Sequence, residues 1–324
     1  MTDKGRPVGP QSVRVLVLGG YGHFGTRVCR ALANEPSIQL VIAGRCLDRA
    51  NELCRRLGTN PERHEAARVD HGAVDFGATL ASLCVDVVIH TGGPYQGQNY
   101  HVAEACIVAS IHYVDLADGR EFVANITRLD RAARDAGVLA VSGASTLPAV
   151  SSCVVDHYLP DFKTLTAVRV SITPGQRTPR GVATLEAVLS YCGWPFVQLE
   201  HGKGRTVYGW QELQRFHYPD LGTRWLGVCD VPDLSLFPQR YPDLQTVQFH
   251  AGLELSVMQW SMWGLAWLVR LGVVKQLSRY ARALKRIGDQ FQSIRFLFGA
   301  GRVVGGSGRS ANQLLAAGRK SNRF

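Results

Sequence analysis

The sequence predicts an α/β fold in which a doubly wound parallel sheet is followed by a second, α+β domain. Over residues 13–142, short β-branched apolar runs alternate with helical stretches, and the first of these runs leads directly into a glycine-rich turn. After Pro148 the alternation stops. Alternation at this pitch indicates βαβ units, whose right-handed crossovers place helices on both faces of the sheet. With 324 residues, the chain has the length of two domains.

The first domain is expected to contain six strands. The runs VRVLVL and VDVVIH are apolar throughout most of their length, which is typical of parallel strands buried on both faces. The predicted strands are 13–18, 38–43, 67–69, 85–90, 112–115 and 138–142. The predicted helices between and after them are 23–33, 47–57, 74–83, 100–109 and 121–136.

The second domain has a different rhythm. Residues 148–158 and 184–191 have helical spacing, and 246–250 read as a strand. The stretch TLTAVRVSI at 164–172 alternates apolar and polar residues, as an antiparallel strand with one solvated face does. The predicted organisation is a flexible N-terminus 1–12, a dinucleotide-binding domain 13–145, a substrate or dimerisation domain 146–256, apolar then basic helices 257–298, and a disordered basic tail 299–324.

Residues 257–274 are unusually apolar and contain three tryptophans. Gln259, Ser261 and Arg270 interrupt the run, so a buried or interfacial helix is favoured over a membrane span, which needs about 20 predominantly apolar residues. Residues 275–291 are basic and amphipathic, and the region 257–291 is a candidate for peripheral membrane contact. The apolar second domain also favours a homodimer.

Composition and charge indicate which cellular compartment and which classes of partner are favoured. The first residues lack the apolar segment of a secretory signal, and the cysteines have no CxxC spacing, so we expect reduced thiols, no metal site and a cytoplasmic location. The net charge of +10 comes from residues 265–324, which hold 12 basic residues and Asp289 as the single acidic one. No aromatic-rich nucleic-acid module accompanies these charges, which disfavours nucleic acid as a partner.

The turn after the first strand fits the spacing G-x-G-x-x-G. Its members are Gly20, Tyr21, Gly22, His23, Phe24 and Gly25. This motif, placed between a strand and a helix, is typical of the dinucleotide-binding Rossmann arrangement. Gly20 is expected to form the tight turn, Gly22 to admit a pyrophosphate, and Gly25 to let helix and strand pack. The alternative spacing Gly19, Gly22, Gly25 occurs in short-chain reductases, but no tyrosine here has a lysine four residues later.

The end of the second strand selects the cofactor. An NAD site has an acidic residue at this point to bind the ribose hydroxyls, whereas this chain has Gly44 and then Arg45. A guanidinium suits a 2′-phosphate, so the sequence predicts NADP(H). Asp70, after the third strand, is expected to meet the adenine amino group.

Two further strand ends supply candidates for the chemistry. Ligands of open α/β sheets bind beyond the carboxyl ends of the strands. The turn of Gly92, Gly93 and Pro94 follows the fourth strand and is expected to approach the cofactor. Tyr95 follows that turn, and Asp115 and Asp118 follow the fifth strand. These three are the candidate proton-exchanging groups, although both aspartates also suit helix capping.

The chain resembles the saccharopine dehydrogenase-like family of NADP-binding oxidoreductases. The resemblance rests on GGYGHFG, AGR after the second strand, GGPYQGQNYHVAEACI, HYVDLADGREF and SGASTLPAVSS, and covers about residues 13–155. Residues 224–270 are similar to an uncharacterised bacterial branch. The family implies a Rossmann domain, a second α/β domain and a C-terminal segment that completes the first domain. Here the resemblance fades beyond about residue 295, which suggests a truncated or frame-shifted C-terminus.

The main functional hypothesis is an NADP(H)-dependent oxidoreductase. It would transfer a hydride to or from a small carbonyl, imine or enoyl substrate in a cleft between the two domains. The alternative is a non-catalytic NADP(H)-binding protein, a membrane-peripheral sensor or scaffold, which needs the glycine loop and Arg45 but no acid or base.

Overall fold

The computed structural model describes residues 12–58, 63–176, 178, 181–219, 221–291 and 311–320. The chain forms two compact units, each described by itself. Unit 1 comprises Met1–Gly92, Gln98–Ala117 and Asn125–Ala144, and unit 2 comprises Gly93–Gly97, Asp118–Ala124 and Ser145–Phe324. Two short segments inside the predicted first domain therefore group with unit 2. The predicted flexible N-terminus lies almost wholly outside the described residues.

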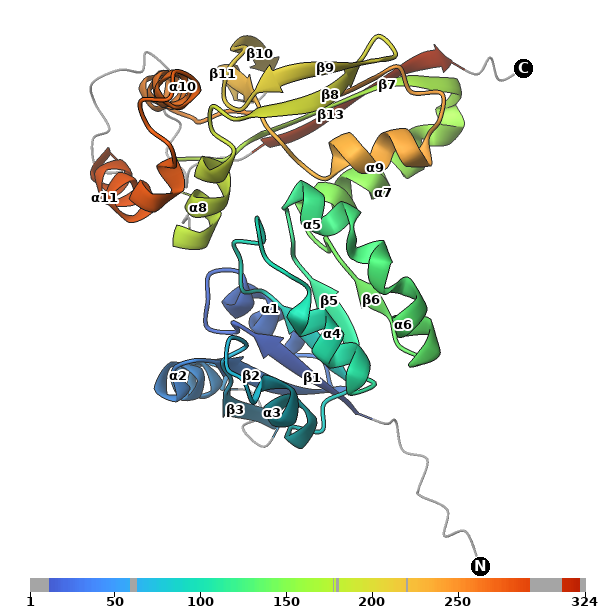
Figure 1. Ribbon diagram of the computed structural model, residues 1–324, viewed down its shortest axis with the longest axis vertical. Coiled ribbons are helices and arrows are strands. Elements are labelled where there is room, and N and C mark those ends of the chain that lie inside the picture. The colour runs from blue at the N-terminus through green and yellow to red at the C-terminus, as the bar shows by residue number, and fades with distance from the viewer. Residues whose placement is uncertain are drawn as a thin grey trace, which may run out of the picture. The chain divides into compact units, whose positions relative to one another are not determined.

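Unit 1 contains a six-stranded sheet in which every neighbouring pair is parallel, in the order β3-β2-β1-β4-β5-β6 (Figure 1). The predicted fold class is confirmed. The strands are β1 Val13–Leu18, β2 Ile38–Gly44, β3 His64–Arg68, β4 Val87–His90, β5 His112–Asp115 and β6 Ala140–Val141. β3 begins three residues earlier than predicted, and β6 is reduced to two residues.

The order of the strands explains the apolar runs. β1 has a neighbour on each side, and Leu16, Val17 and Leu18 are at most 2% exposed, so both faces of the strand are buried. The helices of this unit are α1 Gly25–Leu32, α2 Leu47–Leu57, α3 Phe76–Ser82, α4 His101–Val108 and α6 Asp130–Asp135. Cys29 of α1 and Leu53 of α2 pack with β1 and β2 in one apolar cluster.

The single helix predicted over 121–136 is wrong. The segment forms α5 Arg120–Ala124, a 3₁₀ turn at Ile126–Leu129 and then α6. Asn125, at φ −97° and ψ 3°, lies outside helical geometry and separates α5 from the turn. α5 groups with unit 2, whereas α6 groups with unit 1.

Unit 2 is built on β7 Phe162–Thr173, which lies between β12 and β13 in a sheet ordered β10-β11-β12-β7-β13. Its other strands are β8 Pro195–Glu200, β9 Lys203–Tyr208, β10 Gln214–Tyr218, β11 Gly222–Val228, β12 Thr246–Ala251 and β13 Ala311–Lys320. β7 is longer than predicted and runs parallel to β12, so the expectation of a purely antiparallel strand is wrong. On its other side, β7 pairs antiparallel with β13.

β13 also corrects the disordered tail predicted over 299–324. Ten of those residues form a strand along β7, and the remaining residues of the tail lie outside the described ranges. The apolar pattern around LLAA is compatible with a strand, but the glycine and arginine content of the neighbouring sequence concealed it.

The helices of unit 2 pack on one large apolar cluster. They are α7 Ser151–Tyr158, α8 Val182–Ser190, α9 Asp233–Arg240, α10 Ser256–Arg270 and α11 Ala281–Phe291. Phe237 of α9 and Ala266 of α10 are fully buried and pack with Val168 of β7. Among the described residues, no helix has the length and hydrophobicity needed to cross a bilayer.

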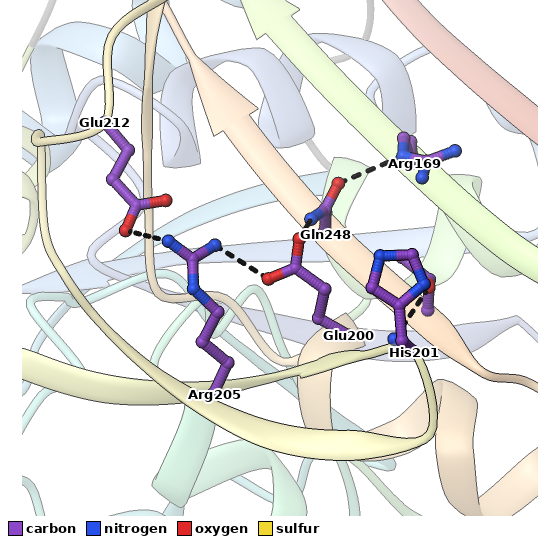
Figure 2. Close-up of polar contacts among 7 residues, drawn as sticks. Arg169, Glu200, His201, Arg205, Glu212 and Gln248 are labelled. Carbon is purple, nitrogen blue, oxygen red and sulfur yellow. Dashed lines mark hydrogen bonds and ion pairs between the residues drawn. The ribbon is translucent and has the colours of Figure 1, made fainter.

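A chain of polar contacts crosses the strands of unit 2 (Figure 2). The Nε of Arg169 donates to Gln248 at 3.0 Å, and the amide nitrogen of Gln248 donates to Glu200 at 3.2 Å. Arg205 then bridges Glu200 and Glu212 at 2.7 and 2.6 Å. The contacts join β7, β12, β8 and β9. Because Arg205 is about half exposed, we expect these contacts to fix the register of the strands more than to stabilise the fold.

Candidate cofactor-binding site

The glycine loop after β1 is held by contacts of its own backbone. Gly19 adopts φ +82°, a left-handed conformation that favours glycine, and its carbonyl accepts the N–H of Gly22 at 2.8 Å. A Cβ at residue 25 would collide with the Gly19 carbonyl oxygen. This hydrogen bond closes a turn over Gly20 and Tyr21, so Gly20 lies in the tight turn, and Gly25 packs directly against the backbone of Gly19 and Gly20.

The loop presents unused donors at the start of α1. The N–H groups of His23, Phe24 and Gly25 donate no hydrogen bond to any described residue. Free N–H groups and the positive end of the helix dipole together favour an anion. The geometry thus fits a pyrophosphate, and the half-exposed ring of Phe24 leaves this end of the helix open.

The end of β2 carries an aromatic and two arginines. The ring of Tyr21 covers Gly44 so closely that a Cβ there would lie 2.6 Å from the phenol. The guanidinium of Arg49 lies over the same ring, 4.6 Å from its centre. Arg45 is exposed and has no hydrogen bond or ion pair among the described residues. Arg45 and Arg49 therefore offer positive charge beside Tyr21, as a 2′-phosphate requires.

Asp70 follows β3 and is exposed. One of its carboxylate oxygens accepts the backbone N–H of Gly72 at 3.1 Å, which closes a turn. The residue thus lies at the predicted strand end and has a local structural contact.

Three histidines lie together: His71 after β3, His90 at the end of β4 and His101 at the start of α4. The rings of His71 and His90 are 5.6 Å apart, and Nδ1 of His71 lies 3.2 Å from Nε2 of His101. Burial, reinforced by the two neighbouring rings, lowers the pKa of His90 to about 3. A Cβ at Gly92 would lie 3.1 Å from Nε2 of His90. The bare backbone at Gly92 thus accommodates a buried imidazole. Gly93 and Pro94 come next in the chain and group with unit 2.

The three candidate proton-exchanging residues differ in surroundings. Asp115 is fully buried and accepts hydrogen bonds from Ala117, Gly143 and Ser142 at 2.8–2.9 Å, so it anchors the loops after β5 and β6. Tyr95 is 4% exposed and packs on Phe122. Asp118 is partly buried, accepts one hydrogen bond from Gln96 at 3.2 Å, and has its pKa raised by burial. Asp115 belongs to unit 1, whereas Tyr95 and Asp118 belong to unit 2.

Sequence reasoning overlooked Arg49 and the histidine group. Arg49 lies four residues after Arg45, in the first turn of a helix that was predicted correctly, and this spacing was a usable signal. No local pattern links His71, His90 and His101, because three separate segments bring them together. Among the described residues, neither these histidines nor any other group of three or more His, Cys, Asp or Glu side chains has an arrangement that could hold a metal ion.

Comparisons with known proteins agree with this geometry. Residues 15–141, less than half of the chain, match the family model for the saccharopine dehydrogenase NADP binding domain. No curated protein matches the chain. Among solved structures, apo saccharopine dehydrogenase (L-Glu forming) from Saccharomyces cerevisiae shares 18% identity at a TM-score of 0.54, covering 74% of this chain and 55% of its own. This chain therefore spans less than two thirds of that relative.

Two other solved structures are similar at lower TM-scores. GenD2 from gentamicin A biosynthesis, in complex with NAD, has 16% identity and a TM-score of 0.40, covering 78% of this chain and 68% of its own. Biliverdin reductase from Synechocystis sp. PCC 6803, in complex with biliverdin and NADP⁺, has 16% identity and a TM-score of 0.41, covering 76% and 72%. In its sheet order, its glycine loop and the family match, the segment 15–141 is similar to the NADP binding domain of saccharopine dehydrogenase.

Proposed function

We propose that the chain is an NADP(H)-dependent oxidoreductase acting on a small carbonyl, imine or enoyl substrate. The observation that carries the proposal is the loop Gly19–Gly25, whose free N–H groups meet the start of α1. When bound, NADP(H) supplies or accepts the hydride at its nicotinamide ring. The chain's own residues bind and orient the cofactor and handle the proton.

Each part of the loop has an assigned task in this proposal. His23, Phe24 and Gly25 donate their N–H groups to the pyrophosphate, and Gly20 and Gly22 keep the path to them clear. Arg45 and Arg49 bind the 2′-phosphate beside Tyr21 and Gly44. A charge-assisted contact contributes about 1.5–3 kcal/mol, so Arg45 favours NADP(H) over NAD(H) by roughly 10- to 150-fold. Asp70, Gly92, Gly93 and Pro94 are further proposed contacts.

Asp118 is the first proton-exchanging group to test. Burial raises the pKa of its carboxyl toward the range useful for acid catalysis at neutral pH, and Gln96 orients one oxygen. Asp115 already accepts three hydrogen bonds, which suits a positioning residue. Tyr95 stays a second candidate, packed on Phe122.

The cofactor half of the proposal is tested by fluorescence titration with NADPH and with NADH. We expect NADPH to bind at least about tenfold more tightly, and Arg45→Ala to remove most of that preference. Arg131→Ala, which changes a 95% exposed arginine on α6, is the matched control and should behave as wild type. Equal affinity for both cofactors in the wild type would contradict the assignment of Arg45.

The catalytic half is tested by NADPH oxidation with a panel of carbonyl, imine and enoyl compounds. Asp118→Asn and Tyr95→Phe are expected to lower turnover. The affinity of each variant for NADPH should stay within a factor of about two or three of the wild-type value. Tight NADPH binding with no turnover of any class would instead favour the non-catalytic NADP(H)-binding protein.

A further inference from the structure

Helix α10 has apolar side chains on two opposite faces. One face packs into the core of unit 2 through the buried residues Met262, Ala266 and Val269. The opposite face consists of Val257, Trp260, Gly264, Leu268 and Leu271, which follow one another at three- and four-residue steps and so form a single stripe. We call these five residues the α10 stripe.

The α10 stripe is open to solvent. Val257, Trp260 and Leu268 are 40–44% exposed, and Leu271 is 68% exposed. At the centre of the stripe, a Cβ on Gly264 would meet no atom within 4 Å. Val273, 70% exposed, extends the apolar surface past the end of the helix. Single exposed apolar residues are ordinary, whereas a continuous row of this length marks an interaction surface.

Aromatic rings form one border of the stripe. Trp225, Trp260, Trp263 and Trp267 contact one another in sequence, edge to face, with ring centres 5.3–6.1 Å apart. The guanidinium of Arg270 continues the row over Trp267 at 4.8 Å. Tryptophan combines a large apolar surface with one polar N–H, and this combination is enriched where lipid meets water.

Basic residues follow the α10 stripe along the chain. From residue 270 to 286 the chain carries six basic residues, Arg270, Lys275, Arg279, Arg282, Lys285 and Arg286. Asp289 of α11 is the acidic residue that follows, and it pairs with Lys285 at 2.6 Å. Gly288 of α11 approaches Met258 of α10, where a Cβ on the glycine would lie 3.6 Å from Cε of the methionine. The cations thus lie in the seventeen residues that begin at the end of α10, and the helix that carries three of them, α11, approaches α10 at Met258.

We propose that the α10 stripe inserts into the surface of a bilayer rich in anionic lipids, with the basic residues of 270–286 binding the headgroups. The helix lies in the interface and does not span the membrane, which agrees with the absence of a spanning helix from the described residues. A second copy of the chain is a poorer occupant, because a two-fold contact would place two sets of these cations together. The proposal is independent of the proposed enzymatic function.

The experiment is co-sedimentation of the full chain with vesicles of phosphatidylcholine alone or with 30% phosphatidylglycerol, on the order of natural anionic content. We expect binding to the anionic vesicles, weakened by salt, with a blue shift of tryptophan fluorescence. Leu271→Asp is expected to lower the partition coefficient at least about tenfold, since it removes a leucine that would enter the bilayer and adds a charge that anionic headgroups repel. Arg282→Gln and Arg286→Gln are expected to lower it about fivefold each.

Leu139→Asp is the matched control, because Leu139 is 67% exposed and lies in unit 1. It should bind vesicles as the wild type does. Failure of the wild type to bind anionic vesicles would overturn the proposal. So would equal loss of binding in both leucine variants, or a dimer in sedimentation equilibrium that Leu271→Asp dissociates. NADPH titration of the same samples reports separately on the proposed enzymatic function.

Discussion

The phenol oxygen of Tyr21 accepts the backbone N–H of Cys46 at 2.8 Å. Tyr21 lies inside the glycine loop, and Cys46 directly follows Arg45. The contact therefore ties the proposed pyrophosphate site to the proposed 2′-phosphate site, and the ring between them supports the guanidinium of Arg49. Cofactor affinity is expected to depend on this bond even though the phenol need not touch the ligand.

Tyr21→Phe tests this dependence. The variant keeps the ring beneath Arg49 but leaves the Cys46 N–H without its acceptor, so we expect the dissociation constant for NADPH to rise about 3- to 10-fold, the equivalent of about 0.5–1.5 kcal/mol. Isothermal titration calorimetry measures the change. Tyr158→Phe, at a half-exposed position on α7, should leave the affinity unaltered. Unchanged affinity in Tyr21→Phe would show that the loop holds its shape without this bond.

Two glycine-to-alanine substitutions should change the free energy of unfolding in opposite directions. Gly25→Ala places a methyl group against the Gly19 carbonyl, so the free energy of unfolding should fall by about 1–3 kcal/mol. Gly77→Ala, in α3, meets no atom within 4 Å and should raise it by about 0.5–1 kcal/mol. Urea denaturation monitored by circular dichroism measures both. A neutral Gly25→Ala would mean that the loop relaxes without cost.

The buried Asp233 predicts a stability that declines as pH rises. Burial raises the pKa of its carboxyl from 3.8 to about 6, and its partner is the hydroxyl of Ser151, which also bonds the Pro148 carbonyl at 3.0 Å. A hydroxyl has one hydrogen, so a protonated carboxyl supplies the second bond. The folded state therefore favours the neutral form of Asp233. The contribution of this group to the free energy of unfolding is complete below pH 4 and is lost as the pH rises through 6.

Asp233→Asn keeps a neutral group at every pH. Between pH 4 and pH 7.5 the wild type should lose up to about 3 kcal/mol of unfolding free energy that the variant keeps. This figure follows from the shift in the pKa of Asp233 at 1.36 kcal/mol per pKa unit. Urea unfolding at several pH values between 4 and 8 measures the difference. The control, Asp135→Asn on the exposed surface of α6, should follow the wild-type profile. Parallel profiles for Asp233→Asn and wild type would place the titration elsewhere.

The buried His90 predicts the opposite pH dependence, a stability that declines as the pH falls. Its pKa falls from 6.5 to about 3 because the ring is buried and because His71 and His101 lie beside it. Folding thus disfavours the protonated form, and the stability that His90 contributes is lost as pH falls below 6.5. We expect His90→Gln to reduce the acid-induced loss of unfolding free energy between pH 6.5 and 4, measured by urea denaturation. His217→Gln, exposed on β10, should not reduce it.

The parts of the fold that could be predicted are those specified by local sequence. β1, β5 and α2 have the predicted boundaries, because each apolar run or helical stretch is set by its own residues and their burial. The break at Asn125 was missed because helical spacing continues across it. β13 was missed because its order depends on β7, a partner far away in the sequence.

The same division applies to the candidate site. The glycine loop and Arg45 follow from a motif and a strand end, and both are local. The cover that Tyr21 forms over Gly44 depends on contact between neighbouring strand ends. The three hydrogen bonds to Asp115 come from two separate loops, so the sequence could not distinguish a positioning carboxylate from a proton donor. The proton donor stays a prediction.

The pairing of β7 with β13 has a consequence for synthesis of the protein on the ribosome. All residues of unit 1 are translated before most of unit 2. β7 is one of the first strands of unit 2 to leave the ribosome, but it cannot pair with β13 until that last described strand of the chain has been synthesised. During that interval the twelve-residue edge of β7 is without this neighbour. Open edges of this length invite pairing between nascent chains, so the interval is the point at which aggregation and chaperone capture would compete with folding.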